Sequence, residues 1–154
     1  MRERRMFLAM WPNEQQIEQL HSLQSAYSGM GREVSPENFH ITLLFLGNVS
    51  NHIVDCLSDS ISDLMINPFA VRLDRLGYFD KTKIFWIGPS QVPNEMEHLF
   101  KTVRQQAQRC GITQLNKKYV PHVTLLRKCD GLCSNSDFTP IAVSYTHLTL
   151  PTKA

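Results

Sequence analysis

The sequence lacks the features that would place it outside ordinary globular proteins. It has no low-complexity segment, and hydrophobic residues make up 42% of its 154 residues, enough for the core of one domain. It also lacks a long apolar run. The apolar stretch near the N-terminus extends only from Met6 to Trp11 before Pro12 interrupts it, which is too short for a signal peptide or a membrane span. We therefore expect a cytoplasmic chain with no membrane partner.

Cysteine is scarce, and its spacing does not indicate a disulfide framework. The four cysteines are Cys56, Cys110, Cys129 and Cys133. Cys129 and Cys133 supply two thiols, which is half of a zinc site, and no histidine follows at ligand spacing. We expect reduced cysteines and no metal.

Several catalytic motifs are also absent. The chain contains no phosphate-binding P-loop, no Gly-x-Ser-x-Gly elbow and no dinucleotide-binding glycine motif. It has no His-Glu-x-x-His pair with a carboxylate ligand for zinc. These absences argue against nucleoside triphosphatases, serine hydrolases of the elbow type, dehydrogenases and zinc peptidases, and we expect no cofactor.

A short motif occurs twice. His40-Ile-Thr-Leu-Leu-Phe-Leu-Gly47 and Pro121-His-Val-Thr-Leu-Leu-Arg127 have cores that differ by one methylene group over five positions. Both runs are apolar and β-branched, which predicts buried strands. Because side chains alternate along a strand, His40 and Thr42 should share one face, while Ile41, Leu43 and Phe45 occupy the other. His122 and Thr124 should share a face in the same way.

The paired motif indicates acid–base chemistry on a phosphate. A single buried histidine is usually a packed, hydrogen-bonded residue, but two of them, each with a threonine on its own face, are harder to explain as packing. Two imidazoles with ordinary pKa values of about 6.5 can hold one proton between them near neutral pH. They can then serve as general base and general acid on one phosphorus, while the threonine hydroxyls donate to phosphate oxygens.

The charge distribution is compatible with an anionic ligand. Residues 1–100 contain 8 basic and 12 acidic side chains, whereas residues 101–154 contain 8 basic and 2 acidic ones. Either this is an ordinary surface distribution, or it produces a positive field near the second motif that attracts a phosphate. The cations concerned are Lys117, Lys118, Arg127 and Lys128.

The remaining pattern predicts alternating strands and helices. Strands are expected over residues 5–10, 40–47, 69–76, 84–87 and 121–127, and helices over residues 14–28, 51–64 and 93–110. Asn13 and Gln16 are placed to form a capping box, and Ser50 can cap the second helix. This order predicts an α+β fold with two similar lobes that face one another.

The two motifs resemble the signatures of the 2H phosphoesterases. Together with the first strand followed by Trp11-Pro12, the Gly31-Arg32 loop and the strand near residue 84, they are most similar to the bacterial branch of RNA 2′,3′-cyclic phosphodiesterases, also called 2′-5′ RNA ligases. The resemblance covers about residues 4 to 130. It implies a bilobal fold with a central cleft between two β-sheet lobes, RNA ends or nucleotides as partners, and no metal.

The resemblance also implies a reaction and residue roles. A ribose 2′,3′-cyclic phosphate would be hydrolysed to a 2′-phosphomonoester, and in reverse the same groups would form a 2′-5′ linkage. We expect His122 as the base, His40 as the acid, and Thr42 and Thr124 as phosphate ligands. Arg127 matches the arginine that closes the family's second motif, although strict alternation places it on the face opposite His122.

The C-terminal end departs from this family. Family members continue with further strands, whereas residues 144–154 contain a third His-x-Thr-Leu at His147 that ends at once in Pro151. We expect one domain over residues 1–143, an atypical, non-native or truncated tail, and a monomer. Three alternatives stay open: an enzyme for another small cyclic phosphate, an inactive module that binds RNA ends, and a non-functional fragment.

Overall fold

A computed structural model describes residues 3–113, 115, 119–131, 138–145 and 152–153. Strands and helices follow one another largely in the order that the sequence predicts. The strands are β1 (Glu3–Met10), β2 (Arg32–Glu33), β3 (Ile41–Ser50), β4 (Phe69–Leu73), β5 (Arg75–Phe79), β6 (Ile84–Gly88), β7 (Val123–Arg127), β8 (Ile141–Tyr145) and β9 (Thr152–Lys153). The helices are α1 (Glu14–Ser25), the short 3-10 helix η1 (Pro36–Asn38), α2 (Asn51–Ser62) and α3 (Asn94–Arg109).

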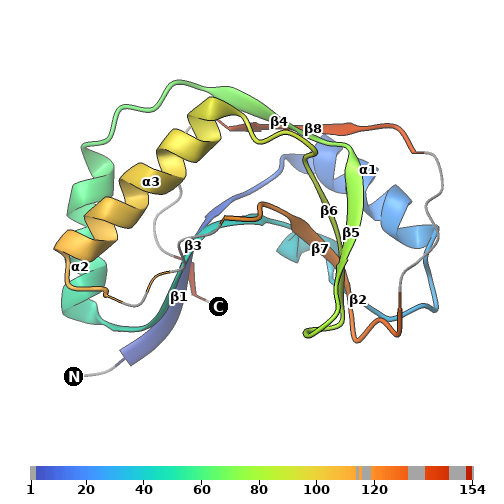
Figure 1. The fold of residues 1–154 in the computed structure, drawn as a ribbon, viewed down its shortest axis with the longest axis horizontal. Coiled ribbons are helices and arrows are strands. Elements are labelled where there is room, and N and C mark those ends of the chain that lie inside the picture. The colour runs from blue at the N-terminus through green and yellow to red at the C-terminus, as the bar shows by residue number, and fades with distance from the viewer. Residues whose placement is uncertain (1–2, 114, 116–118, 132–137, 146–151, 154) are drawn as a thin grey trace.

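The main sheet consists of two wings joined at one point. Its strand order is β5-β6-β7-β3-β1-β9, β2 also pairs with β7, and every pairing is antiparallel. The β1–β3 wing and the β5–β6–β7 wing meet only where Ile41 pairs with Val123, among the residues that the structure describes. From this junction the wings spread apart (Figure 1). The predicted α+β architecture with two lobes is confirmed.

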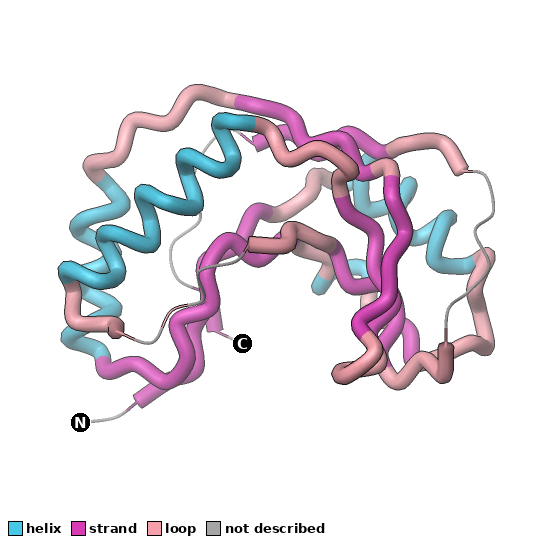
Figure 2. The backbone as a smooth tube through the Cα atoms, in the orientation of Figure 1, coloured by secondary structure: helices cyan, strands magenta, loops and turns pink. Residues whose placement is uncertain are grey.

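The helices cover the outer side of each wing. Helices α2 and α3 pack together against β3, while α1 packs against β7 and β8. Figure 2 shows these two groups of helices on opposite flanks of the strands. The predicted caps are present: Asn13 Oδ1 accepts from the Gln16 amide at 2.8 Å, Gln16 Oε1 accepts from the Asn13 amide at 2.9 Å, and Ser50 Oγ accepts from the Ile53 amide.

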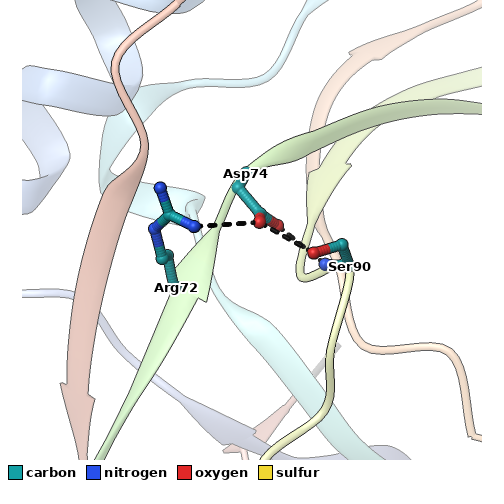
Figure 3. Close-up of polar contacts among 3 residues, drawn as sticks. All are labelled: Arg72, Asp74 and Ser90. Atoms are coloured by element: carbon teal, nitrogen blue, oxygen red, sulfur yellow. Dashed lines mark hydrogen bonds and ion pairs between the residues drawn. The ribbon is translucent and has the colours of Figure 1, made fainter.

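The strand expected over residues 69–76 is two strands in two different sheets. Strand β4 pairs with β8, and β5 pairs with β6 in the main sheet. The chain changes sheet at Asp74, whose carboxylate accepts hydrogen bonds from the Ser90 amide and hydroxyl at 2.7 Å each and forms an ion pair with Arg72 (Figure 3). The two Ser90 hydrogen bonds hold the pKa of Asp74 below its ordinary value. The prediction of one strand missed this corner because alternation continues through it.

The expectation of reduced cysteines is wrong for two of the four. Cys56 on α2 and Cys110, which caps the end of α3, form a disulfide with their Cα atoms 5.8 Å apart. They are 54 residues apart in sequence, so no local spacing pattern could reveal the pair. Cys129 is free and buried, and Cys133 lies outside the described residues.

The C-terminal segment contributes two strands. Strand β8 extends from residue 141 through residue 145 along β4, and the two residues of β9 pair with Met6 and Phe7 of β1. His147 lies outside the described residues. In the part of the chain that is described, no helix combines the length and the apolar character that a membrane crossing needs.

Candidate active site

The junction between the wings places the two predicted histidines side by side in the fold. His40 directly precedes β3 and His122 directly precedes β7, and the next residue of each, Ile41 or Val123, forms the single pair that joins these strands. Both histidines and the threonines Thr42 and Thr124 line one cleft of about 1110 Å³. The structure therefore brings together the four residues that the repeated motif singled out.

Each histidine is held by a backbone carbonyl two residues before it. His40 Nδ1 lies 2.7 Å from the Asn38 oxygen, and His122 Nδ1 lies 2.8 Å from the Val120 oxygen. A carbonyl oxygen can only accept, so Nδ1 must carry the hydrogen in both rings. The other ring nitrogen, Nε2, is then an acceptor when the imidazole is neutral and a donor when it is charged. Both rings are thus prepared for proton transfer through Nε2.

Two aromatic residues pack around each imidazole. Phe7 stacks on His40 with 4.8 Å between ring centroids, and Trp11 lies 5.1 Å from it. On the other wing, Phe79 meets His122 edge-on at 4.9 Å, and Trp86 lies 5.9 Å away. The two halves of the cleft therefore repeat the same surroundings for their histidines, one phenylalanine and one tryptophan each.

This apolar packing lowers the pKa of both histidines. Burial is the largest cause for His40; the Asn38 carbonyl raises its pKa, and the positive charge of Arg127 lowers it. For His122 burial again comes first; the Val120 carbonyl raises its pKa, and charges on His40 and Arg127 lower it. Because a proton on His40 disfavours a proton on His122, the pair tends to hold one proton rather than two.

A β-bulge in each motif strand corrects the prediction of strict alternation. On β3, Thr42 faces Ala9 and Leu44 faces Leu8, so Leu43 is an extra residue. Consecutive leucines, Leu43 with Leu44 and likewise Leu125 with Leu126, are therefore both buried. Phe45, the residue after the leucine pair on β3, is 41% exposed and lines the cleft, so its expected place on the opposite face is wrong.

The equivalent bulge on β7 brings Arg127 to the cleft. Thr124 faces Trp86 and Leu126 faces Phe85, which leaves Leu125 as the extra residue. Arg127 lines the cleft, although strict alternation placed it on the face away from His122. Phe45 and Arg127 occupy the same position in the two copies of the motif. Both residues follow the double leucine. This shared position in the motif could have predicted from the sequence that Phe45 lines the cleft.

Sequence reasoning missed other residues that line the cleft. Phe45 stacks on Phe7 with 6.5 Å between centroids and 4° between planes, and the Arg5 guanidinium lies 5.0 Å from the Phe45 ring. Arg32 lines the cleft on the β7 side. Lys117 and Lys118, which were expected to contribute positive charge, lie outside the described residues. Among the described residues, no three His, Cys, Asp or Glu side chains gather as metal ligands would.

Known proteins are similar to this chain in both sequence and fold. The sequence profile of the family described as LigT like Phosphoesterase matches residues 10–86. The RNA 2′,3′-cyclic phosphodiesterase of Escherichia coli K12 is 37% identical over 97 residues, which are 63% of this chain and 55% of that protein. The one from Methanocaldococcus jannaschii is 30% identical over 128 residues, which are 80% of this chain and 70% of that protein.

Solved structures agree with these sequence relatives. The crystal structure of E. coli LigT in apo form has a TM-score of 0.83 at 28% identity and covers 97% of this chain and 87% of its own. The structure of E. coli LigT complexed with 3′-AMP has a TM-score of 0.82 at 28% identity and covers 92% and 83%. This chain spans only 55% of the E. coli sequence relative. The profile match reaches across half of the chain, and with the fold it confirms the resemblance seen in the two motifs: the chain belongs to the LigT-like phosphoesterase family.

Proposed function

We propose that this chain hydrolyses a 2′,3′-cyclic phosphate on RNA or a nucleoside to a 2′-phosphomonoester without a metal. The observation that carries the proposal is the pair of imidazoles at one junction, each with Nδ1 fixed by a carbonyl and Nε2 left for proton transfer. Two such groups can remove a proton on one side of a phosphorus and supply one on the other. Relatives named RNA 2′,3′-cyclic phosphodiesterase support the choice of substrate.

In this mechanism His122 is the base and His40 is the acid. Burial, followed by the charges on His40 and Arg127, lowers the pKa of His122. We assign the single proton to His40 and the neutral ring to His122. His122 Nε2 takes a proton from water as the water oxygen bonds to phosphorus. The bond from phosphorus to O3′ breaks, and His40 Nε2 gives its proton to O3′. The product is a 2′-phosphate with a free 3′-hydroxyl, and a proton returns from His122 to His40 through solvent.

Neighbouring groups would stabilise the charge that builds on the phosphate. The hydroxyls of Thr42 and Thr124 can donate to non-bridging oxygens, and Arg127 can contribute a charge-assisted hydrogen bond from the end of β7. With the 5′-hydroxyl of an RNA end in place of water, the same residues would form a 2′-5′ linkage: O5′ bonds to phosphorus, its proton passes to His122, and O3′ leaves with the proton from His40.

The two wings are unequal, and this difference gives the substrate an orientation. The β7 wing presents Arg127 where the β3 wing presents Phe45, an exposed ring stacked on Phe7. A nucleobase gains about 1–3 kcal/mol from stacking on such a ring. We therefore place the phosphate toward β7 and the base toward β3. All these residues lie within residues 1–143, which we propose as the catalytic domain of a cytoplasmic monomer.

The test is turnover of a 2′,3′-cyclic nucleotide by EDTA-treated protein, with chromatography that separates 2′- from 3′-phosphate product. We expect only the 2′-product, and we expect His40→Ala and His122→Ala each to lower kcat by about 10²–10⁴. Melting curves of both variants show whether they stay folded. Formation of the 3′-product, loss of turnover with EDTA, or unchanged turnover in either folded variant would contradict the proposal.

A further inference from the structure

Two arginines stand directly opposite each other at the edge of the cleft. Arg32 of β2 is the cross-strand partner of Arg127 of β7, and both line the cleft. Like charges at opposed positions of neighbouring strands repel and lower stability. In the part of the chain that the structure describes, neither arginine forms an ion pair, although Glu33 also lines the cleft. Two uncompensated cations at one edge of the cleft supply the charge that a bound anion would neutralise.

The chain holds Arg32 at this place with buried structure. The side-chain amide of Gln24, which is 1% exposed, donates to the carbonyl oxygens of Val34 at 2.8 Å and Leu125 at 2.9 Å. The Val34 amide donates to the same Leu125 oxygen at 3.1 Å. These bonds fasten the segment after Arg32 to β7.

A glycine allows the close approach on the other side of Arg32. A Cβ atom at Gly31 would lie 2.9 Å from the Arg127 carbonyl oxygen, so only glycine fits there without a shift. The position of Arg32 beside Arg127 is therefore set by the backbone on both sides and does not depend on a free loop.

The two arginines differ in their effect on the pKa values of the histidines. Arg127 is the one whose charge lowers the pKa of both His40 and His122, so it is close to the reacting phosphate. Arg32 lines the cleft from the added strand β2, and its charge is not among the causes that shift the pKa of either histidine. A nucleotide with its 2′,3′-phosphate at Arg127 and its base at Phe45 has one further substituent on the ribose, the 5′-oxygen, which in RNA carries the next phosphate.

We propose that Arg32, beside Arg127, binds the phosphodiester on the 5′ side of the terminal nucleotide. The substrate class is then an RNA end of two or more nucleotides, favoured over a cyclic mononucleotide without a 5′-phosphate. This inference rests on the proposed function, because it takes the cyclic phosphate to be bound at the histidines.

The experiment compares three substrates on the full chain: a cyclic mononucleotide, a dinucleotide ending in a 2′,3′-cyclic phosphate, and the same dinucleotide with a neutral methylphosphonate linkage. With the wild-type protein, neutralising the linkage should lower kcat/KM about tenfold, as expected for one charge-assisted contact. Arg32→Gln should lower kcat/KM about tenfold for the charged dinucleotide and should no longer distinguish the charged from the neutral linkage. It should also reduce the salt dependence by about 0.7 in the slope of log kcat/KM against log salt.

Arg72→Gln is the matched control, because Arg72 is an exposed arginine that does not line the cleft and its loss changes the net charge equally. The inference is overturned if Arg32→Gln impairs the mononucleotide as much as the dinucleotide, or if it retains the full sensitivity to linkage charge. If the wild-type protein turns over none of the substrates, the proposed function fails. The inference is then decided by calorimetric affinity for a dinucleotide with a 2′-phosphate end, using the same linkage pair and the same variants.

Discussion

A substitution at Gly77 tests the packing around His122 directly. Gly77 on β5 is the cross-strand partner of Trp86 on β6, and a Cβ atom at Gly77 would lie 2.1 Å from Cζ2 of the indole. Ordinary contact requires about 3.4–4 Å, so the indole of a Gly77→Ala variant must move by more than 1 Å. It cannot move freely, because Trp86 is buried and packs against Phe79 and His122.

The expected cost of this overpacking is about 1–3 kcal/mol of unfolding free energy. For a chain of this size that corresponds to a fall in Tm of roughly 2–12 °C. Displacement of the indole should also move His122, and a misplacement of about 1 Å can lower kcat by up to about 10²-fold. Calorimetry measures the first effect, and turnover of a cyclic nucleotide measures the second.

Trp86→Phe removes the ring atoms that Gly77→Ala would strike. The double variant should therefore be more stable than the sum of the two single changes predicts, by about 1 kcal/mol or more. It should also recover part of the turnover that Gly77→Ala loses. If the two changes add to within about 0.5 kcal/mol, or if Gly77→Ala keeps wild-type stability and kcat, the proposed packing of Trp86 between Gly77 and His122 is refuted.

Two further predictions concern reduction and pH. Reducing the Cys56–Cys110 bond releases a loop with a sequence separation of 54 residues, and the chain-entropy model gives a loss of about 4 kcal/mol in unfolding free energy. Calorimetry with and without reductant should therefore show Tm falling by roughly 10 °C, and an unchanged Tm would contradict this. The second prediction follows from the pKa values of His40 and His122, which lie below the ordinary 6.5 in the folded chain. Below pH 6.5 the unfolded chain then binds more protons, so unfolding free energy should fall as pH drops. The decline of kcat/KM at high pH should begin below pH 6.5. In Arg127→Gln it should begin at a higher pH, because the Arg127 charge lowers both pKa values. A decline that begins at the same pH in this variant would refute the prediction.

The sequence predicted most of the fold because its strongest signals are local. The apolar periodicity of α3, the Asn13–Gln16 capping box and the β-branched motif strands all appear as expected. What it could not show depends on contacts distant along the chain. The Cys56–Cys110 pair and the pairing of β2 with β7 each join residues more than fifty positions apart. The corner at Asp74 was missed because the local alternation continues through it, while the contact that marks it is made to Ser90, 16 positions away.

In the candidate site, too, some positions could be predicted from the sequence and others could not. Alternation placed each histidine correctly with its threonine, because no bulge lies between them. It failed three residues beyond each threonine, where an extra leucine reverses the face of every later side chain. The double leucine is the local trace of that bulge, because two consecutive residues cannot both be buried in a regular strand that faces an open cleft. The pattern His-x-Thr-Leu-Leu-x therefore predicts a cleft residue at its last position.

That last position is where the two copies differ, and it offers the sharpest test of how the substrate is oriented. If the base stacks on Phe45, Phe45→Leu should keep the burial around Phe7 but remove the aromatic face, raising KM for a cyclic nucleotide by about tenfold while kcat changes little. Phe45→Tyr, which retains the ring, is the matched control and should behave like the wild type. The reacting phosphate lies with Arg127 on the other wing, so Arg127→Gln should instead lower kcat. If Phe45→Leu lowers kcat and Arg127→Gln changes only KM, the assignment of the two wings must be reversed.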